Sequence, residues 1–297
     1  MIAIAESGST KTEWFVLNDE GEIVNNFNTQ GFNPDFHSAN DISAALKEVD
    51  EIVRYSEQVC KVYFFGASCS SEVNIAKVKA GIQAVFTTNS IHVDHDLLAC
   101  AYALSDGQPL ITCILGTGSN SAYFDGEKMQ EEIPALGVFM GDEGSGAYFG
   151  KRFIRDYFYK KLPKEMEDEV NLQFNLKWSE VRQVIYGSNQ ANVYLALFMP
   201  FIYQFKDHPY VRDIVEEGIA AFIDAHVCCF SEYPSKEVGF VGTLAFLFQD
   251  IVDKKLSERG FKLVKVVKGP GKNLVEYLIK YKGILDTSTT NATSLAG

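Results

Sequence analysis

Short apolar runs alternate with glycine-rich and polar turns over the first third of the chain. Several runs are rich in β-branched and aromatic residues, which favour strands, and two longer stretches are predicted to be helical. The predicted strands are 2–5, 14–17, 22–27, 61–66 and 90–93, and the predicted helices are 38–55 and 71–85. The first three strands follow one another through short turns and form a meander. The alternation after them predicts a mixed sheet with helices on its faces.

The rest of the chain contains a second group of strands and a long helical region. The predicted strands are 110–115, 122–124, 238–246, which runs into a helix, and 261–267. The predicted helices are 97–104, 147–162, 179–186, 194–205, 211–230 and 274–281. A cluster of turn residues over 105–109 separates the two groups of strands and predicts a border between two lobes.

Composition and charge narrow the class of protein. The chain has 297 residues, of which 46% are hydrophobic and 22% charged, as in a folded protein of one large or two ordinary domains. Its net charge of -12 argues against a broad nucleic-acid surface, which needs clustered Lys and Arg, but allows a nucleotide site built from backbone amides. No apolar run approaches the roughly 20 residues of a membrane span, and no signal peptide is evident. We therefore expect a cytoplasmic protein with neither nucleic acid nor membrane as a partner.

The six cysteines agree with that compartment. None forms a Cys-x-x-Cys pair, and most lie within apolar runs. We interpret them as small buried thiols in a reducing cytosol.

Two strand–turn–strand units carry similar glycine and hydroxyl turns. The turn at Gly116–Ser119 follows the apolar run 110–115, and the turn at Gly8–Thr12 follows the run 2–5. Glycines let the backbone approach a ligand closely, and converging amides form a nest that binds anions. Each turn alone also fits an ordinary hairpin. Two such units in one chain suggest that they grip successive phosphates of one nucleotide from opposite sides of a cleft.

Two polar residues in the first half of the chain are candidates for chemistry. Asp96 immediately precedes the apolar helix 97–104, which makes it an N-cap by position. Alternatively, its carboxylate faces a cleft and takes a proton from a substrate hydroxyl. Asn33 lies in an Asn-Pro loop and is either a turn former or a polar group aimed into a cleft.

A second acidic motif lies at the start of the predicted helix 147–162. Asp142 and Glu143 stand in the first turn, where carboxylates suit the helix dipole. Three glycines within 141–146 are more than capping requires, and they indicate close approach to a ligand. His226 lies on a largely apolar helix and is interpreted as a core histidine whose hydrogen bonds are satisfied.

Taken in order, these motifs resemble a known family. Ser7–Thr12, Asp96, Gly116–Asn120, Gly141–Ser145 and Gly242-Thr243 resemble the N-acetylglucosamine kinase and BadF/BadG-type ATPase group of the actin, hexokinase and Hsp70 superfamily. The resemblance extends from Ile2 to about Tyr281. It implies an α/β fold of two ribonuclease-H-like lobes, each a mixed sheet flanked by helices.

The resemblance also implies the domain organisation. The N-terminal lobe would span 1–106, with the closing helix 272–283 packed back on it. The C-terminal lobe would span 107–271 and contain a helical insertion over 164–235. This insertion would shape either the specificity pocket or a dimer face, and a homodimer is expected.

ATP, Mg²⁺ and a sugar are the ligands that the resemblance implies, and the reaction is transfer of the γ-phosphoryl group to a sugar hydroxyl. Asp96 would be the catalytic base. The implied phosphate ligands are Gly8, Ser9, Thr10, Lys11 and Thr12 in the first turn and Gly116, Thr117, Gly118 and Ser119 in the second. Gly242 and Thr243 would lie against adenosine, and the implied sugar ligands are Asn33, Asn120, Asp142 and Glu143. An amino sugar, N-acetylglucosamine or a related N-acetylated hexosamine, is the expected acceptor.

One departure from the family pattern leaves alternatives open. Glu6 stands where relatives usually carry the Asp that holds a water on Mg²⁺, and its extra methylene moves the carboxylate. The alternatives are a non-catalytic sugar or nucleotide sensor, and an ATPase activator of a partner enzyme. The chain has neither a Gly-x4-Gly-Lys-Ser/Thr motif nor a Gly-x-Gly-x-x-Gly after a strand, which excludes P-loop and dinucleotide-binding proteins.

Overall fold

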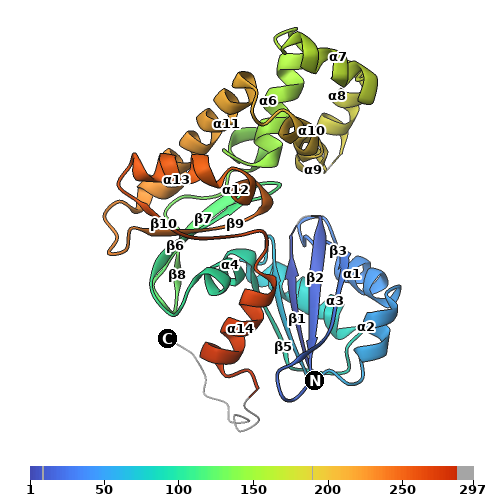
Figure 1. The fold of residues 1–297 in the computed structure, drawn as a ribbon. Coiled ribbons are helices and arrows are strands. Elements are labelled where there is room, and N and C mark those ends of the chain that lie inside the picture. The colour runs from blue at the N-terminus through green and yellow to red at the C-terminus, as the bar shows by residue number, and fades with distance from the viewer. Residues whose placement is uncertain (9, 189, 286–297) are drawn as a thin grey trace. The chain divides into compact units, whose positions relative to one another are not determined.

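The chain divides into two compact units in the computed structural model, which describes residues 1–8, 10–188 and 190–285. Unit 1 comprises Met1–Gly107 and Gly271–Gly297, and unit 2 comprises Gln108–Pro270 (Figure 1). No helix in the described part of the chain is long and apolar enough to cross a membrane.

Unit 1 is built on a five-stranded mixed sheet in the order β3-β2-β1-β4-β5. Its strands are β1 (Ile2–Ser7), β2 (Lys11–Leu17), β3 (Ile23–Gln30), β4 (Lys61–Gly66) and β5 (Ile91–His95). The first three pair antiparallel as the predicted meander, and β4 and β5 continue the sheet in parallel. The fully buried Trp14 packs between Phe64 and Phe86 in the core.

Five helices accompany this sheet: α1 (Ala39–Lys47), α2 (Asp50–Tyr55), α3 (Glu72–Gln83), α4 (Asp96–Leu104) and α14 (Gly271–Lys282). The single helix predicted over 38–55 is wrong, because Val49 has an extended backbone and separates α1 from α2. Ser38 begins α1 with a capping box, in which its side chain and that of Asp41 satisfy each other's backbone N–H groups. Tyr277 of α14 stacks on Tyr102 of α4 with ring centroids 4.6 Å apart, which packs α14 against α4 within unit 1 (Figure 1).

Unit 2 repeats the sheet of unit 1. Its strand order is β10-β9-β6-β7-β8, with bounds β6 (Leu110–Leu115), β7 (Ser119–Phe124), β8 (Met129–Gln130), β9 (Glu237–Val241) and β10 (Lys262–Val267). Again three consecutive strands pair antiparallel, and two later strands extend the sheet in parallel from the first of them. The repeat therefore covers a whole sheet, whereas the sequence reveals it only at the two turns.

Most of the helices of unit 2 lie between β8 and β9. They are α5 (Gly137–Met140), α6 (Gly146–Phe158), α7 (Lys164–Gln173), α8 (Trp178–Gly187), α9 (Ala191–Ala196), α10 (Met199–Gln204) and α11 (Pro209–Phe222), with α12 (Thr243–Leu247) and α13 (Gln249–Ser257) between β9 and β10. The helix predicted over 194–205 is two helices. Pro200 stands in the first turn of α10, where its missing N–H costs nothing.

The helix predicted over 211–230 also changes character. Its α-helical part ends at Phe222, and the chain continues as a π-helical turn over Ile223–Val227 and a 3-10 turn over Cys228–Phe230. Such π-turns widen a helix locally and recur at functional sites.

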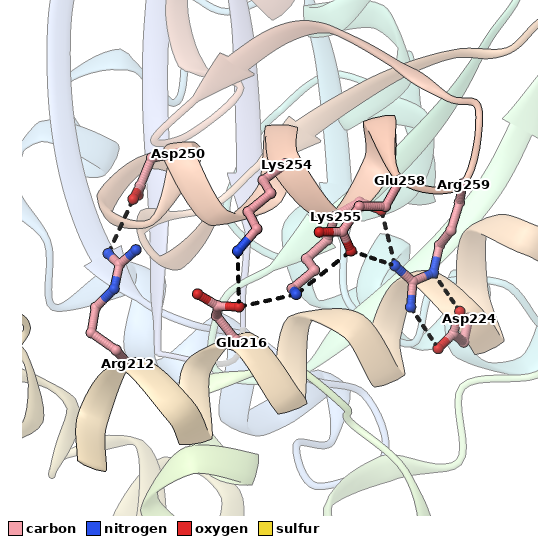
Figure 2. Close-up of polar contacts among 8 residues, drawn as sticks. All are labelled: Arg212, Glu216, Asp224, Asp250, Lys254, Lys255, Glu258 and Arg259. Carbon is pink, nitrogen blue, oxygen red and sulfur yellow. Dashed lines mark hydrogen bonds and ion pairs between the residues drawn. The ribbon is translucent and has the colours of Figure 1, made fainter. Parts of the chain in front are cut away.

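Ion pairs join α11 to α13 on the surface of unit 2 (Figure 2). The pairs between the two helices are Arg212–Asp250 at 3.0 Å and Glu216 with Lys254 at 3.3 Å and Lys255 at 3.0 Å. Arg259, just beyond α13, binds both carboxylate oxygens of Asp224. Exposed pairs of this kind contribute about 0–1 kcal/mol each, so the packing beneath them dominates the stability of this contact.

Candidate functional site

The first glycine turn joins β1 to β2. The Gly8 N–H donates to the Lys11 carbonyl at 3.0 Å, and the Gly31 N–H donates to the Thr10 carbonyl at 3.1 Å. These bonds hold a tight turn at the end of the sheet. Ser9, one of the predicted phosphate ligands, lies outside the described residues.

Thr12 supports this turn from beneath. It is 0% exposed, and its hydroxyl donates to the Gln30 carbonyl at 2.9 Å and lies 2.7 Å from the Ser7 hydroxyl. The Ser7 oxygen in turn accepts the Phe32 N–H at 2.9 Å. Thr12 therefore fixes the strand ends below the turn, and its contact with phosphate stays a prediction.

Glu6 and Asp96 are two acidic residues of unit 1 whose charges interact. Burial, together with the charges of Asp96 and Glu13, raises the pKa of Glu6 to about 8, and the charge of Lys11 opposes this shift. Glu13 lies opposite Glu6 in the β1–β2 register. When no metal ion is bound beside it, Glu6 is therefore largely protonated at neutral pH.

Asp96 is the first residue of α4. The helix N-cap is His95, whose side chain makes no capping bond, so the N-cap interpretation of Asp96 is wrong by one residue. Asp96 Oδ1 accepts the N–H of Leu97 at 2.9 Å. The first turn of a helix is a position where the helix dipole stabilises a carboxylate.

Asn33 forms a turn, which is one of the two roles that the sequence suggests for it. Its side-chain oxygen accepts the Asp35 N–H at 2.9 Å, and its carbonyl accepts the N–H groups of Phe36 and His37 at 3.0 and 2.8 Å. The turn-forming interpretation is confirmed. Its role as a sugar ligand stays a prediction that rests on the side-chain amide.

The second glycine turn, between β6 and β7, is held by the start of α6. The N–H groups of Gly146 and Ala147 donate to the carbonyls of Gly116 and Thr117 at 2.9 and 3.1 Å. The C=O and N–H of a trans peptide point in opposite directions. The N–H groups of Thr117 and Gly118 therefore point away from α6, and no hydrogen bond within the described residues occupies them. Two adjacent amides directed outward from a turn are the elements of an anion nest.

Asp142 lies against this turn. Its carboxylate accepts the Ser119 N–H at 3.3 Å, and a Cβ placed on Gly118 would come within 3.1 Å of Asp142 Oδ1, so a side chain there would push the carboxylate aside by a few tenths of an ångström. Burial raises the pKa of Asp142, which is 7% exposed, and the bond from Ser119 lowers it. The Ser119 hydroxyl is buried without a partner among the described residues, which is unusual unless a ligand or water satisfies it.

Strand alternation separates the polar residues that follow this turn. Ser119 and Ser121 point to one face of β7 and Asn120 to the other, because successive side chains alternate. Asn120 Oδ1 accepts the Ser121 N–H at 2.8 Å. Asn120 is therefore not on the face of β7 that carries Ser119.

His226 is the residue of this region whose role the sequence did not reveal. It is 4% exposed and stacks on Phe222, which confirms that it is a core histidine. Its Nε2 also lies 3.8 Å from Glu143 Oε2. The π-helical turn that places it there has no signature in the hydrophobic pattern.

Gly242 is required by packing. Its φ is +132°, and a Cβ there would lie 2.1 Å from the Leu115 carbonyl oxygen, so the tight strand-to-helix turn alone demands glycine. Thr243, the first residue of α12, is exposed. Contact of this pair with adenosine stays a prediction.

Unit 1 contains carboxylates that could serve as ligands of Mg²⁺. Among the described residues, no three His, Cys, Asp or Glu side chains gather closely enough to hold a metal by themselves. Mg²⁺ usually takes one or two carboxylates and completes its shell with waters and phosphate oxygens. Glu6 beside Asp96 supplies such carboxylates, and their mutual repulsion would be relieved by a cation. These residues fit the ion.

Comparison with solved structures identifies the fold class. The chain is similar to a candidate N-acetylglucosamine kinase of Porphyromonas gingivalis, with 30% identity and a TM-score of 0.87 over 95% of this chain and 100% of that one. A candidate N-acetylglucosamine kinase of Chromobacterium violaceum matches at 16% identity and a TM-score of 0.63, covering 93% of this chain and 98% of that one. A ROK-family glucokinase of Streptomyces griseus, solved with glucose and AMPPNP, matches at 16% identity and a TM-score of 0.55, covering 93% and 97%.

These likenesses place the chain among the two-lobed α/β proteins of the actin-like ATPase fold, as predicted. It belongs to the N-acetylglucosamine-kinase-like family within that fold. No family model matches the chain, and no curated protein matches it.

Proposed function

We propose that this protein is an ATP-dependent kinase that transfers a phosphoryl group to a hydroxyl of an amino sugar, N-acetylglucosamine or a related N-acetylated hexosamine. The observation that carries the proposal is the turn at Gly116–Ser119, whose Thr117 and Gly118 amides point outward while α6 holds the carbonyls. A phosphate is the ligand that such amides suit best. The likeness to a candidate N-acetylglucosamine kinase at 30% identity supports the choice of acceptor.

Each unit carries candidate nucleotide-binding groups of its own. In unit 1, the Gly8–Thr12 turn binds phosphate through backbone groups and Lys11, with Thr12 as a positioning residue below it. In unit 2, Thr117, Gly118 and Ser119 bind phosphate, and Gly242 and Thr243 lie against adenosine. Mg²⁺ would be held through water by Glu6 and would neutralise charge on the phosphate oxygens.

Asp96 is the general base. Its carboxylate accepts the proton of the sugar hydroxyl as the hydroxyl oxygen attacks the γ-phosphorus, a contribution of roughly 10²–10⁴ in rate. Asn33, Asn120, Asp142 and Glu143 orient the sugar, since vicinal hydroxyls need paired donors and acceptors. The remaining rate enhancement comes from placing the hydroxyl in line with the γ-phosphate and from neutralising charge on the phosphate oxygens, because phosphoryl transfer requires little covalent catalysis by the protein.

A coupled ADP-release assay with Mg·ATP and a panel of hexoses and amino sugars tests this function. Wild type is compared with Asp96→Asn, which keeps the size of the side chain. Asp94→Asn is the matched control, because Asp94 is a neighbouring acid whose Oδ1 accepts the His95 N–H at 2.8 Å. Sugar-dependent ADP release that only Asp96→Asn abolishes supports the kinase. Absence of turnover with every sugar refutes it.

A second candidate is a non-catalytic sugar or nucleotide sensor, favoured by Glu6, whose raised pKa weakens it as a magnesium ligand. Sugar binding without turnover, restored by Glu6→Asp, would favour this candidate. An ATPase activator carrying an iron–sulfur cluster would give a coloured protein, and we expect a colourless one. A cytoplasmic homodimer remains our prediction, to be checked by light scattering.

A further inference from the structure

His226 lies at the centre of a short polar chain in unit 2. Its Nε2 is 3.8 Å from Glu143 Oε2, and its Nδ1 is 3.5 Å from the Ser121 hydroxyl. The Ser121 hydroxyl donates to the backbone carbonyl of His226 itself at 2.7 Å. The Phe222 ring stacks on the imidazole at 4.9 Å with an angle of 13° between the rings, which fixes the orientation of the imidazole plane.

These contacts determine which nitrogen carries the proton. Ser121 has one hydroxyl proton, and it is used at the His226 carbonyl, so it cannot also donate to Nδ1. A bare Nε2 lone pair facing a carboxylate would be repelled. The arrangement without that conflict has a proton on Nε2, directed at Glu143. Burial lowers the pKa of His226, and the charge of Glu143 opposes that shift.

The contact with His226 orients the Glu143 carboxylate. One of its oxygens faces His226, and its side chain is still 28% exposed. Its neighbour Asp142 is held separately, by the Ser119 N–H. Two adjacent carboxylates are thus tied to two different elements, the glycine turn and the π-helical turn, which fixes their relative orientation.

We propose that His226 is a positioning residue for sugar recognition: through Nε2–H it orients Glu143 so that the free carboxylate oxygen accepts a hydroxyl of the sugar. This inference rests on the proposed function, because it takes Glu143 as a sugar ligand. His226 itself touches neither substrate nor nucleotide. Its loss should weaken sugar binding and leave ATP binding unchanged.

The test compares two amides of different length. In His226→Gln the amide reaches about as far as Nε2, so it can still donate to Glu143. In His226→Asn the amide reaches only about as far as Nδ1, so the contact with Glu143 is lost while a polar group remains. His208→Asn is the matched control, because His208 pairs with a different glutamate, Glu165 at 3.0 Å, and is the N-cap of α11.

Steady-state kinetics in the ADP-release assay give the readout. His226→Asn should raise KM for the sugar about 2-fold to 10-fold, as expected for one polar contact, because Nε2 and Oε2 lie 3.8 Å apart, beyond the usual hydrogen-bond distance. KM for ATP should not change, His226→Gln should recover most of the sugar KM, and His208→Asn should match wild type. In a Glu143→Gln background, His226→Asn should add little, because the two side chains act as one unit.

An unchanged sugar KM in His226→Asn, or additive effects with Glu143→Gln, overturns the inference while the kinase proposal stands. No sugar-dependent turnover in wild type overturns both. Circular dichroism of each variant shows whether it is folded. If His226→Asn does not fold, His226→Phe takes its place in the same comparison, because a phenyl ring can still stack on Phe222 but has no donor for Glu143.

Discussion

The stability of unit 1 should depend on pH through Glu6. Burial and neighbouring carboxylates raise its pKa from 4.5 to about 8. As pH rises, the unfolded chain loses this proton first, while the folded chain must either keep the proton or bury a charge. Between pH 4.5 and about pH 8 the unfolded state therefore binds fewer protons than the folded state, and the free energy of unfolding falls with rising pH across that window. Below pH 4.5 Glu6 is protonated in both states, so its contribution to the free energy of unfolding does not change with pH.

The change that isolates this effect is Glu6→Gln, which is similar in size and never ionises. A pKa difference between 4.5 and about 8 corresponds to at most about 5 kcal/mol, at about 1.36 kcal/mol per pKa unit. Glu6 retains some contact with solvent, which screens the repulsion, so we expect a measured difference of about 2–3 kcal/mol. The variant should equal wild type near pH 4.5 and exceed its stability by that amount near pH 8.

Urea unfolding followed by tryptophan fluorescence measures this in unit 1 alone. The chain has two tryptophans: Trp14 is fully buried and pairs with Ala5, next to Glu6, whereas Trp178 is 51% exposed in unit 2. Replacing Trp178 with Phe in both proteins leaves Trp14 as the reporter. Titrating groups that do not interact with Glu6 cancel in the difference between the two proteins.

A difference in unfolding free energy that stays the same from acidic to alkaline pH would refute the reasoning. It would mean that Glu6 ionises normally in the folded protein, and that neither burial nor Asp96 perturbs it. The case for Glu6 as a weakened magnesium ligand would fall with it.

Three further predictions concern stability. Gly150→Ala should cost about 3 kcal/mol of unfolding free energy, because the new Cβ would lie 1.9 Å from the Leu195 carbonyl oxygen where α6 meets α9. Ser38→Ala should cost about 1 kcal/mol by removing the capping box of α1. Arg259→Ala should cost less than about 1 kcal/mol despite its two bonds to Asp224, because that carboxylate is exposed. Urea unfolding monitored by circular dichroism checks all three.

Each of these three predictions has a control variant or an outcome that would contradict it. Gly187→Ala adds a Cβ that meets nothing within 4 Å, so it should be neutral or slightly stabilising. An equal effect at positions 150 and 187 would contradict the packing argument. Ser38→Thr should retain most of the cap, because its hydroxyl can still accept from the Asp41 N–H and donate to the Asp41 carboxylate. A loss above about 2 kcal/mol in Arg259→Ala would show that the network in Figure 2 is worth more than exposed pairs usually are.

Local patterns in the sequence determined much of this protein. The meander 2–27, the parallel strands after it and both glycine turns follow from apolar runs and from the special backbone freedom of glycine. Those signals act over a few residues, so they survive without knowledge of the rest of the chain. The same is true of the helix that begins at Asp96, although its cap lies one residue earlier. The resemblance to sugar kinases depends on these local motifs in order.

Tertiary structure decided what those motifs can do. The outward direction of the Thr117 and Gly118 amides comes from α6, some thirty residues away, and the raised pKa of Glu6 comes from burial and from Asp96. The contact of His226 with Glu143 requires a π-helical turn that no periodicity predicts. Hydrogen-bond direction, desolvation and charge depend on groups brought together by folding, and the spacing of residues along the chain carries no record of them.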